Sequence, residues 1–319
     1  EHEKAGPAFV VGHAFGNRVA RMLATDRPDL VKAVSLIAAN VGRNPSPPNV
    51  RAAIRTSADL KASDEERVKA MQFVFFAPGS DARVWLTGWH PEVLAGQRLA
   101  GDRTSRELDY AAGKAPILYI QPSHDPLARV DEAERLADLA AARRVLAYAR
   151  EALDELVEHL GTDFSRAVDV LYGVKGRVVV TGMGKSGHVG RKIAATLSST
   201  GTPAQFVHPG EASHGDLGTL TQQDALLALS NSGETSELTD LITYVKRYGI
   251  PLLGIAGNAN STLLQAADVA LVLPKLREAC AIGMAPTTST TAMIVLGDAL
   301  AVALMERKGF SAEQYRDLH

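Results

Sequence analysis

Cysteine is almost absent from this sequence, since Cys280 is the only one among 319 residues. A single cysteine excludes an internal disulfide and is typical of a reducing compartment. The sequence also has no unbroken run of about 18 apolar residues, and its first residues, EHEKAGP, do not resemble a signal peptide. We therefore expect a cytoplasmic protein with no membrane partner.

An excess of either charge is missing as well. The formal net charge is −2 and the sequence pI is about 6.6, so nothing indicates binding to nucleic acid or to an anionic membrane surface. Hydrophobic residues make up 46% of the chain and charged residues 22%, which is ordinary for a globular protein.

The chain is long enough for about two domains, and its pattern of apolar segments changes along the sequence. The first part holds three buried-strand candidates, at 8–13, 32–40 and 115–122, with a polar, partly helical stretch between the last two. Residues 130–161 have the apolar spacing of one or two long helices. We expect the domain boundary near residue 140, which gives domains at 1–140 and 141–319.

The second domain alternates short apolar strands with helices. The predicted strands are 177–182, 204–208, 224–230, 250–257 and 269–273, and the predicted helices are 185–199, 235–248, 261–267 and 289–308. Such alternation is typical of βαβ units, so we predict an α/β fold with a parallel sheet covered by helices on both faces.

The segment VVGHAFG, residues 10–16, follows an apolar run and precedes a helical pattern. That is the context of a nucleophile elbow, G-x-S-x-G, which carries a reactive Ser at its centre. The central residue here is Ala14, whose methyl group cannot attack a carbonyl. Covalent hydrolysis by this segment is therefore not expected.

The first domain nevertheless resembles part of the alpha/beta-hydrolase fold, through GHAFGNRVARMLATDRPDLVKAVSLIAAN and PILYIQPSHDPLAR. Asp125 matches the position of that family's triad acid. The strands before the elbow and the closing strand with the catalytic His are missing, and neither His90 nor His124 takes that place. We expect this partial hydrolase-like segment to be non-catalytic.

A glycine-rich stretch, VVVTGMGKSGHVGRK, follows a predicted strand and opens a helix. Its glycines match the dinucleotide fingerprint formally, but the next strand lacks the acidic residue that would hold a ribose hydroxyl. Val179 stands where a P-loop needs its first Gly. No nucleotide cofactor is expected, and the turn with Lys185 suits an anion of modest size, unless it is only a tight connection with a solvated Lys.

A second loop, SNSGETSE at 230–237, also lies between a strand and a helix. Its hydroxyls and the N–H groups of a helix start are suitable donors for a phosphate. A serine-rich N-cap alone is usually only a cap, but loops after neighbouring parallel strands meet where ligands bind. A third hydroxyl cluster, TTSTT, begins at 287. The predicted phosphate-binding residues are Gly184, Ser186, Ser230, Asn231, Ser232, Gly233, Thr235, Ser236, Thr288, Ser289 and Thr290.

The loop HPGEASHGDLG at 208–218 concentrates groups that could bind a metal or move protons: His208, Glu211, His214 and Asp216. One short loop without a second ligand set is not a recognised metal pattern, so no metal is expected. Together with Glu237 and Glu278, the loop supplies acids and bases for moving protons on a polyol. Each residue alone could equally be an ordinary surface group.

These motifs, with REACAIGMAPTTSTTAMIVLGDALAVALMERKGFSAEQYRDLH, resemble the SIS (sugar isomerase) domain of D-arabinose-5-phosphate isomerases from about residue 142 to the end of the sequence. The resemblance implies a five-stranded parallel sandwich, a homotetramer, and cofactor-free interconversion of D-ribulose 5-phosphate and D-arabinose 5-phosphate. It also implies supply of a precursor of the octulosonate sugar of lipopolysaccharide. The catalytic residues that it implies are Lys185, His214, Glu237, Glu278 and His319.

The expected reaction is an isomerisation through an enediolate, in which a carboxylate moves the carbon proton and Lys185 stabilises the developing oxyanion. His214 or His319 would open the sugar ring. In the family, the equivalent of His319 approaches a neighbouring subunit, and a pair of CBS modules follows that is absent from this sequence.

Two other functions stay open from the sequence. SIS folds also occur in regulators, so a sugar-phosphate sensor without turnover is one alternative. An inactive chimera of a hydrolase fragment and an SIS domain is the other. The joint presence of Glu237, Glu278 and His214 favours the enzyme, because a sensor has no need of all three.

Overall fold

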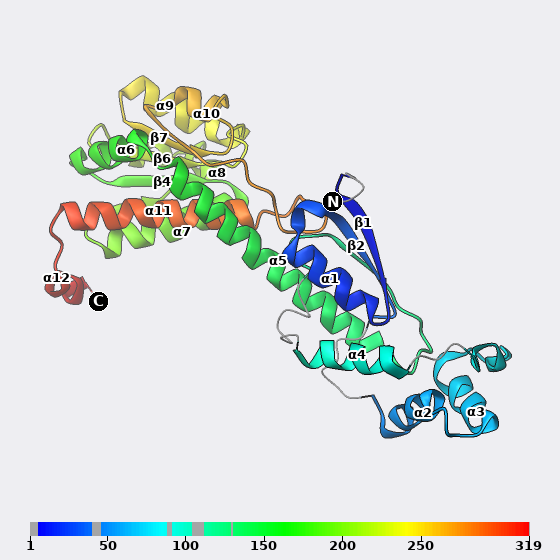
Figure 1. The fold of residues 1–319 in the computed structure, drawn as a ribbon. Coiled ribbons are helices and arrows are strands. Elements are labelled where there is room, and N and C mark those ends of the chain that lie inside the picture. The colour runs from blue at the N-terminus through cyan, green and yellow to red at the C-terminus, as the bar shows by residue number, and fades with distance from the viewer. Residues whose placement is uncertain (1–5, 40–45, 88–90, 104–111, 129, 319) are drawn as a thin grey trace. The chain divides into compact units, whose positions relative to one another are not determined.

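A computed structural model describes residues 6–39, 46–87, 91–103, 112–128 and 130–318. The chain forms two compact units, Glu1–Ala147 and Tyr148–His319, which share the long helix α5 (Val130–His159) (Figure 1). The division therefore falls inside a helix rather than in a loop. The predicted boundary near 140 lies in the same helix.

The first unit is built on a parallel three-stranded sheet in the order β1-β2-β3. Its strands are β1 (Ala8–His13), β2 (Val31–Ile37) and β3 (Ile117–Ile120), and its remaining helices and turns are α1 (Gly16–Asp26), η1 (Pro28–Leu30), α2 (Pro48–Ala58), α3 (Asp64–Phe75), η2 (Ala82–Trp85) and α4 (Pro91–Arg103). The predicted strands at 8–13 and 115–122 are confirmed in place. The last residue of the predicted strand 32–40, like His90, lies outside the described residues.

The second unit holds a parallel five-stranded sheet in the order β5-β4-β6-β7-β8. The strands are β4 (Val178–Gly182), β5 (Ala204–Phe206), β6 (Ala225–Leu229), β7 (Leu252–Ala256) and β8 (Val269–Val272). All five were predicted at these places. Three of them, β4, β6 and β7, are buried at every residue, which explains why they are continuous apolar runs in the sequence.

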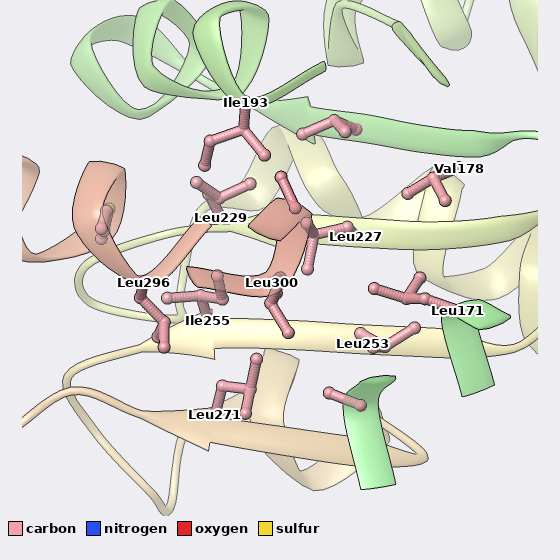
Figure 2. Packing of buried hydrophobic residues seen from close by; sticks show 14 of the residues in the cluster. Leu171, Val178, Ile193, Leu227, Leu229, Leu253, Ile255, Leu271, Leu296 and Leu300 are labelled. Atoms are coloured by element: carbon pink, nitrogen blue, oxygen red, sulfur yellow. The ribbon is translucent and has the colours of Figure 1, made fainter. Parts of the chain in front are cut away.

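Helices cover both faces of this sheet. The helices of this unit that follow α5 are α6 (Thr162–Gly173), α7 (Gly184–Ser199), α8 (Pro209–Ala212), α9 (Thr239–Tyr248), α10 (Thr262–Ala266), α11 (Thr288–Arg307) and the exposed α12 (Ala312–Leu318), with the 3-10 turns η4 (Asp216–Thr219) and η5 (Ser236–Leu238). Helices α6, α7 and α11 pack on one face, and α8, α9 and α10 on the other. Figure 2 shows the first core, in which Ile193 of α7 and Leu296 of α11 approach Leu229 and Ile255 of the sheet.

Helix α11 is long and apolar enough, by length and composition alone, to cross a membrane. In the described structure its side chains instead form part of the first core, where Met293, Leu296 and Leu300 are at most 2% exposed. Burial on a sheet face explains the apolar composition, because core helices of globular domains meet the same criterion.

The contact between α7 and α11 depends on Gly297. A Cβ at this position would lie 2.3 Å from Cδ1 of the fully buried Ile193. We expect Gly297→Ala to destabilise the second unit by about 1–3 kcal/mol, because overpacked cores must shift. Hydrogen exchange of the β4 and β6 amides, which reports opening of this unit, measures the effect.

The matched control is Gly173→Ala at the end of α6, where an added Cβ meets nothing within 4 Å. That change should be neutral or stabilising by up to about 1 kcal/mol. Equal effects at the two positions would contradict the packing argument.

Candidate functional site

The two loops singled out in the sequence begin side by side. Strands β4 and β6 are parallel neighbours, and Gly182 is paired with Leu229 at their carboxyl ends. The chain crosses from β4 to β5 on one side and then returns to β6 on the other. This is the topological switch point of the sheet, where open α/β folds form their ligand crevice.

The turn after β4 is shaped by close backbone approach. A Cβ on Gly187 would lie 2.5 Å from the carbonyl oxygen of Gly182, and Gly184 has a φ of +57°. The side chain of Lys185 is exposed at the start of α7. Ser186 Oγ lies 3.9 Å from Met293 Sδ on α11, so this turn also contacts the first turns of that helix. The glycines therefore serve backbone packing, and Lys185 is left at the surface.

The loop after β6, residues 230–236, is called the hydroxyl loop below. Ser230 Oγ is 2.7 Å from Thr235 Oγ1 and accepts a hydrogen bond from Gly233 N at 3.0 Å. Ser232 Oγ accepts one from Glu234 N at 3.1 Å. These bonds curl the loop around Gly233, whose φ is +71°. Asn231, Ser232 and Ser236 are exposed, which leaves their polar groups accessible to a ligand.

The loop after β5 lies on the same edge of the sheet. Thr181 Oγ1 of β4 donates to the carbonyl of Val207 at 2.8 Å, and His208 Nδ1 accepts from Gly210 N at 3.2 Å, which caps α8. Helix α8, which ends two residues before His214, packs against η5, the turn that carries Glu237. His214 is exposed. Within the described residues, no group of three or more His, Cys, Asp or Glu could hold a metal ion.

Glu237 lies on η5, immediately after the hydroxyl loop. Its own backbone N–H, followed by the Ser236 hydroxyl at 3.0 Å, holds the pKa of this carboxyl below its ordinary value. The side chain is exposed. Glu237 is therefore ionised at neutral pH and can accept a proton from a bound molecule.

Glu278 caps the start of α11. Its Oε2 accepts from the backbone N–H groups of Thr287 and Thr288 at 2.7 and 2.8 Å, and Ser289 donates to Oε1 through its hydroxyl. Partial burial by itself would raise the pKa, but the bonds from Ser289, Thr287 and Thr288 outweigh it and hold the pKa of Glu278 below its ordinary value. A helix N-terminus favours a carboxylate for the same reason.

This capping changes the expectation for residues 288–290. Thr288 N and Ser289 Oγ donate to Glu278, and Thr290 Oγ1 donates to the carbonyl of Thr287 at 3.0 Å. A phosphate at this helix start would have to displace a carboxylate. The arrangement therefore does not favour Thr288, Ser289 and Thr290 as phosphate ligands.

Glu278 should also make the stability of the second unit depend on pH. A carboxyl whose pKa is lowered on folding stabilises the protein above its unfolded pKa, here 4.5, and loses that contribution as pH falls through the lower folded pKa. The difference in unfolding free energy between the wild type and Glu278→Gln should therefore be largest near neutral pH and decrease in acid. Urea unfolding at several pH values, followed by circular dichroism, measures it. A difference that stays constant from about pH 7 to about pH 3 would contradict this role.

The structure thus brings the turn with Lys185, the hydroxyl loop, Glu237 and the His214 segment to one edge of the sheet. Glu278 is bound to the start of α11, which is linked to that edge through Ser186 and Met293. His319 lies outside the described residues. The sequence analysis did not single out Glu234, whose carboxylate accepts hydrogen bonds from Thr262 at the start of α10. No local pattern signals a contact between positions so far apart in the sequence.

The first unit contains a cavity of about 1870 Å³ beside the strand–helix turn at Ala14. Ala14 has a φ of +48°, so the turn has the sharp geometry of an elbow but carries a methyl group. His124 Nδ1 bonds to Ser123 Oγ at 2.8 Å, while Asp125 Oδ1 accepts from the backbone N–H of Leu127 at 2.8 Å. These contacts do not form a relay for acyl transfer.

Comparison with known proteins places the second unit. A family model described as the SIS domain matches residues 171–303. Arabinose 5-phosphate isomerase KdsD of Escherichia coli O157:H7 is 55% identical over 179 residues, which cover 56% of this chain and 55% of that protein. KdsD of Pseudomonas aeruginosa is 53% identical over 186 residues, 58% of this chain and 57% of the relative. The chain spans about half the length of the curated relatives it matches.

A solved structure gives the same result over a whole chain. E. coli CFT073 c3406 in complex with A5P is 36% identical, with a TM-score of 0.56, and the match covers 58% of this chain and 98% of that one. The parallel sheet, the two glycine- and hydroxyl-rich loops and these matches agree. This chain therefore belongs to the SIS-domain family, and its unit from Tyr148 onward carries that domain.

Proposed function

We propose that the SIS unit is an arabinose-5-phosphate isomerase, which interconverts D-ribulose 5-phosphate and D-arabinose 5-phosphate. The observation that carries the proposal is the pairing of the Lys185 turn and the hydroxyl loop at the switch point of the sheet, beside the proton-transfer candidates. The names of the relatives support arabinose 5-phosphate as one partner of this pair, and c3406 is in complex with A5P. By the same resemblance, the product would supply the octulosonate sugar of lipopolysaccharide.

The substrate phosphate would bind at the hydroxyl loop. The loop offers exposed Asn231, Ser232 and Ser236 side chains and backbone N–H groups at a helix start, which suit a dianion. Lys185, across the β4–β6 edge, adds a positive charge. A phosphate held there leaves C1 and C2 of a five-carbon chain within reach of groups from adjoining loops.

Glu237 is the favoured group for moving the carbon proton, because it is ionised and exposed while Glu278 is engaged by α11. Glu237 would take the proton from one carbon of the C1–C2 pair, which gives the enediolate, and would return it to the other carbon. Substrate and product therefore have the same atoms. Lys185 would stabilise the enediolate oxygen. His214 or His319 would open the ring and move hydroxyl protons.

Self-association is part of the proposal. Ile282 and Met284, in the loop that joins Glu278 to α11, are 76% and 79% exposed, and large apolar side chains beside a site are typical of surfaces that a second subunit covers. We propose a homo-oligomer, a tetramer by the family resemblance. Sedimentation of the intact chain tests it.

The test of the function is turnover of D-arabinose 5-phosphate by the intact chain with EDTA present, following the appearance of D-ribulose 5-phosphate. We expect turnover that the chelator does not abolish. Binding of the sugar phosphate without turnover would favour the sensor, and neither binding nor turnover would indicate an inactive chimera.

A further inference from the structure

We propose that Glu234 is a positioning residue that holds the hydroxyl loop in its phosphate-binding shape by joining it to the first turn of α10. The inference rests on the proposed function, because it assigns the loop to the substrate phosphate. Glu234 belongs to neither the acids and bases nor the phosphate donors considered above, and its side chain bonds to a residue 28 positions further along the chain.

Both carboxylate oxygens of Glu234 are used by one residue. Thr262 donates its backbone N–H to Oε1 at 2.8 Å and its hydroxyl to Oε2 at 2.7 Å. The hydroxyl of Thr262, followed by its N–H, holds the pKa of Glu234 below its ordinary value. The carboxylate is therefore charged at neutral pH and its acceptor sites face α10. Charge-assisted bonds of this kind are the stronger ones.

The N-terminus of α10 has no cap from its own N-cap residue. Ser261 occupies its N-cap position but makes no side-chain cap bond, and its buried hydroxyl has no hydrogen-bond partner among the described atoms. Glu234 supplies a cap from the preceding βα loop instead. A cap delivered across two loops fixes the position of one loop relative to the other, which a cap within the helix cannot do.

Two backbone bonds complete the attachment. Leu263 N donates to the carbonyl of Gly233 at 3.1 Å, and Gly257 N donates to the carbonyl of Asn231 at 2.9 Å. Three residues of the hydroxyl loop, Asn231, Gly233 and Glu234, thus hold it to Gly257 after β7 and to the first turn of α10. An anion binds more tightly to loop donors that already point toward a common centre, because ordering them on binding costs affinity.

The experiment compares Glu234→Ala with the isosteric Glu234→Gln, whose amide can keep a bond to each group of Thr262. We expect Glu234→Ala to raise KM for D-arabinose 5-phosphate and Kd for inorganic phosphate by about tenfold, equivalent to about 1.4 kcal/mol, with kcat changed less than about threefold. Glu234→Gln should restore most of the affinity. Calorimetry on the intact chain gives the phosphate Kd without turnover.

Thr262→Val provides the second arm, because it removes one of the two donors. Its effect should be smaller than that of Glu234→Ala, and the double variant should bind phosphate no more weakly than Glu234→Ala alone, since contacting residues are not additive. Asp240→Ala, an exposed acid on the first turn of α9, is the charge-matched control and should leave Kd unchanged.

Three results with the variants would overturn the proposal. They are an unchanged phosphate Kd in Glu234→Ala, additive effects in the double variant, and a fall in kcat with no change in KM. A wild type that fails to bind phosphate would also overturn it. If the wild type binds phosphate but does not turn over the sugar, the isomerase function fails, while the calorimetric comparison still decides the role of Glu234.

Discussion

Glu237→Gln is expected to lower kcat for D-arabinose 5-phosphate by about 10² or more. The substitution keeps the size of the side chain and a hydrogen-bonding group next to Ser236, but an amide cannot accept the carbon proton. The KM and the phosphate Kd should stay within about threefold of the wild type, because the loss concerns the proton-transfer step rather than binding.

Solvent-hydrogen exchange sharpens this prediction. A single base that moves a proton between C1 and C2 also exchanges it with water, so deuterium from the solvent should enter the substrate carbon during turnover by the wild type. Glu237→Gln should lose this incorporation together with turnover. Asp240→Asn, an exposed acid three positions further on, should alter neither. Near-normal kcat in Glu237→Gln would remove Glu237 from the proton-transfer role and leave Glu278 as the remaining carboxylate.

The sheet of the SIS unit could be predicted because its three central strands, β4, β6 and β7, are buried on both faces. Strand β6, predicted at 224–230 and found at Ala225–Leu229, is the clearest case. Element ends were harder to predict. The helix predicted at 235–248 begins at Thr239 as α9, because Ser236–Leu238 forms a 3-10 turn and the Thr235 hydroxyl is bound to Ser230.

Among the described residues of the SIS unit, three helices were not predicted. Helix α8 (Pro209–Ala212) is a single turn inside a segment that was expected to be a loop. Helix α6 (Thr162–Gly173) follows α5 after a short break at Gly161. It was not recognised as a separate helix because the apolar spacing of α5 dominates this part of the sequence. Helix α12 (Ala312–Leu318) is short and mostly exposed, so its sequence has little apolar periodicity.

The sequence predicted the loops of the candidate site but not the hydrogen bonds that link them to other segments. The local sequence indicates that the hydroxyl loop and the Lys185 turn follow strands, and the pairing of Gly182 with Leu229 makes them neighbours. The role of Glu278 on substrate stays a prediction, and its bonds to the start of α11 were not anticipated from the sequence. The contact between Glu234 and Thr262 joins distant positions, and long-range pairs leave no periodic signal in one sequence.

Gly233→Ala should be the most damaging single-atom change in the hydroxyl loop. Gly233 has a φ of +71°, and an added Cβ would lie 2.0 Å from Ser261 Oγ and 2.3 Å from Ser261 Cβ. The left-handed conformation costs a non-glycine residue about 1–2 kcal/mol, and overpacking about 1–3 kcal/mol more. Since Ser261 is fully buried, the loop rather than the serine should move. We expect kcat/KM to fall by about 10² and the phosphate Kd to rise in parallel.

A matched glycine separates the two causes. Gly249, which ends α9, has a φ of +66° with nothing within 4 Å of an added Cβ, so Gly249→Ala carries the backbone strain without the clash and should leave phosphate binding unchanged. In the double variant Gly233→Ala/Ser261→Gly the clash is removed, and part of the affinity should return. If Gly233→Ala binds phosphate like the wild type, the hydroxyl loop is not where the phosphate binds. If the double variant recovers nothing, the strain at φ +71° alone sets the shape of the loop.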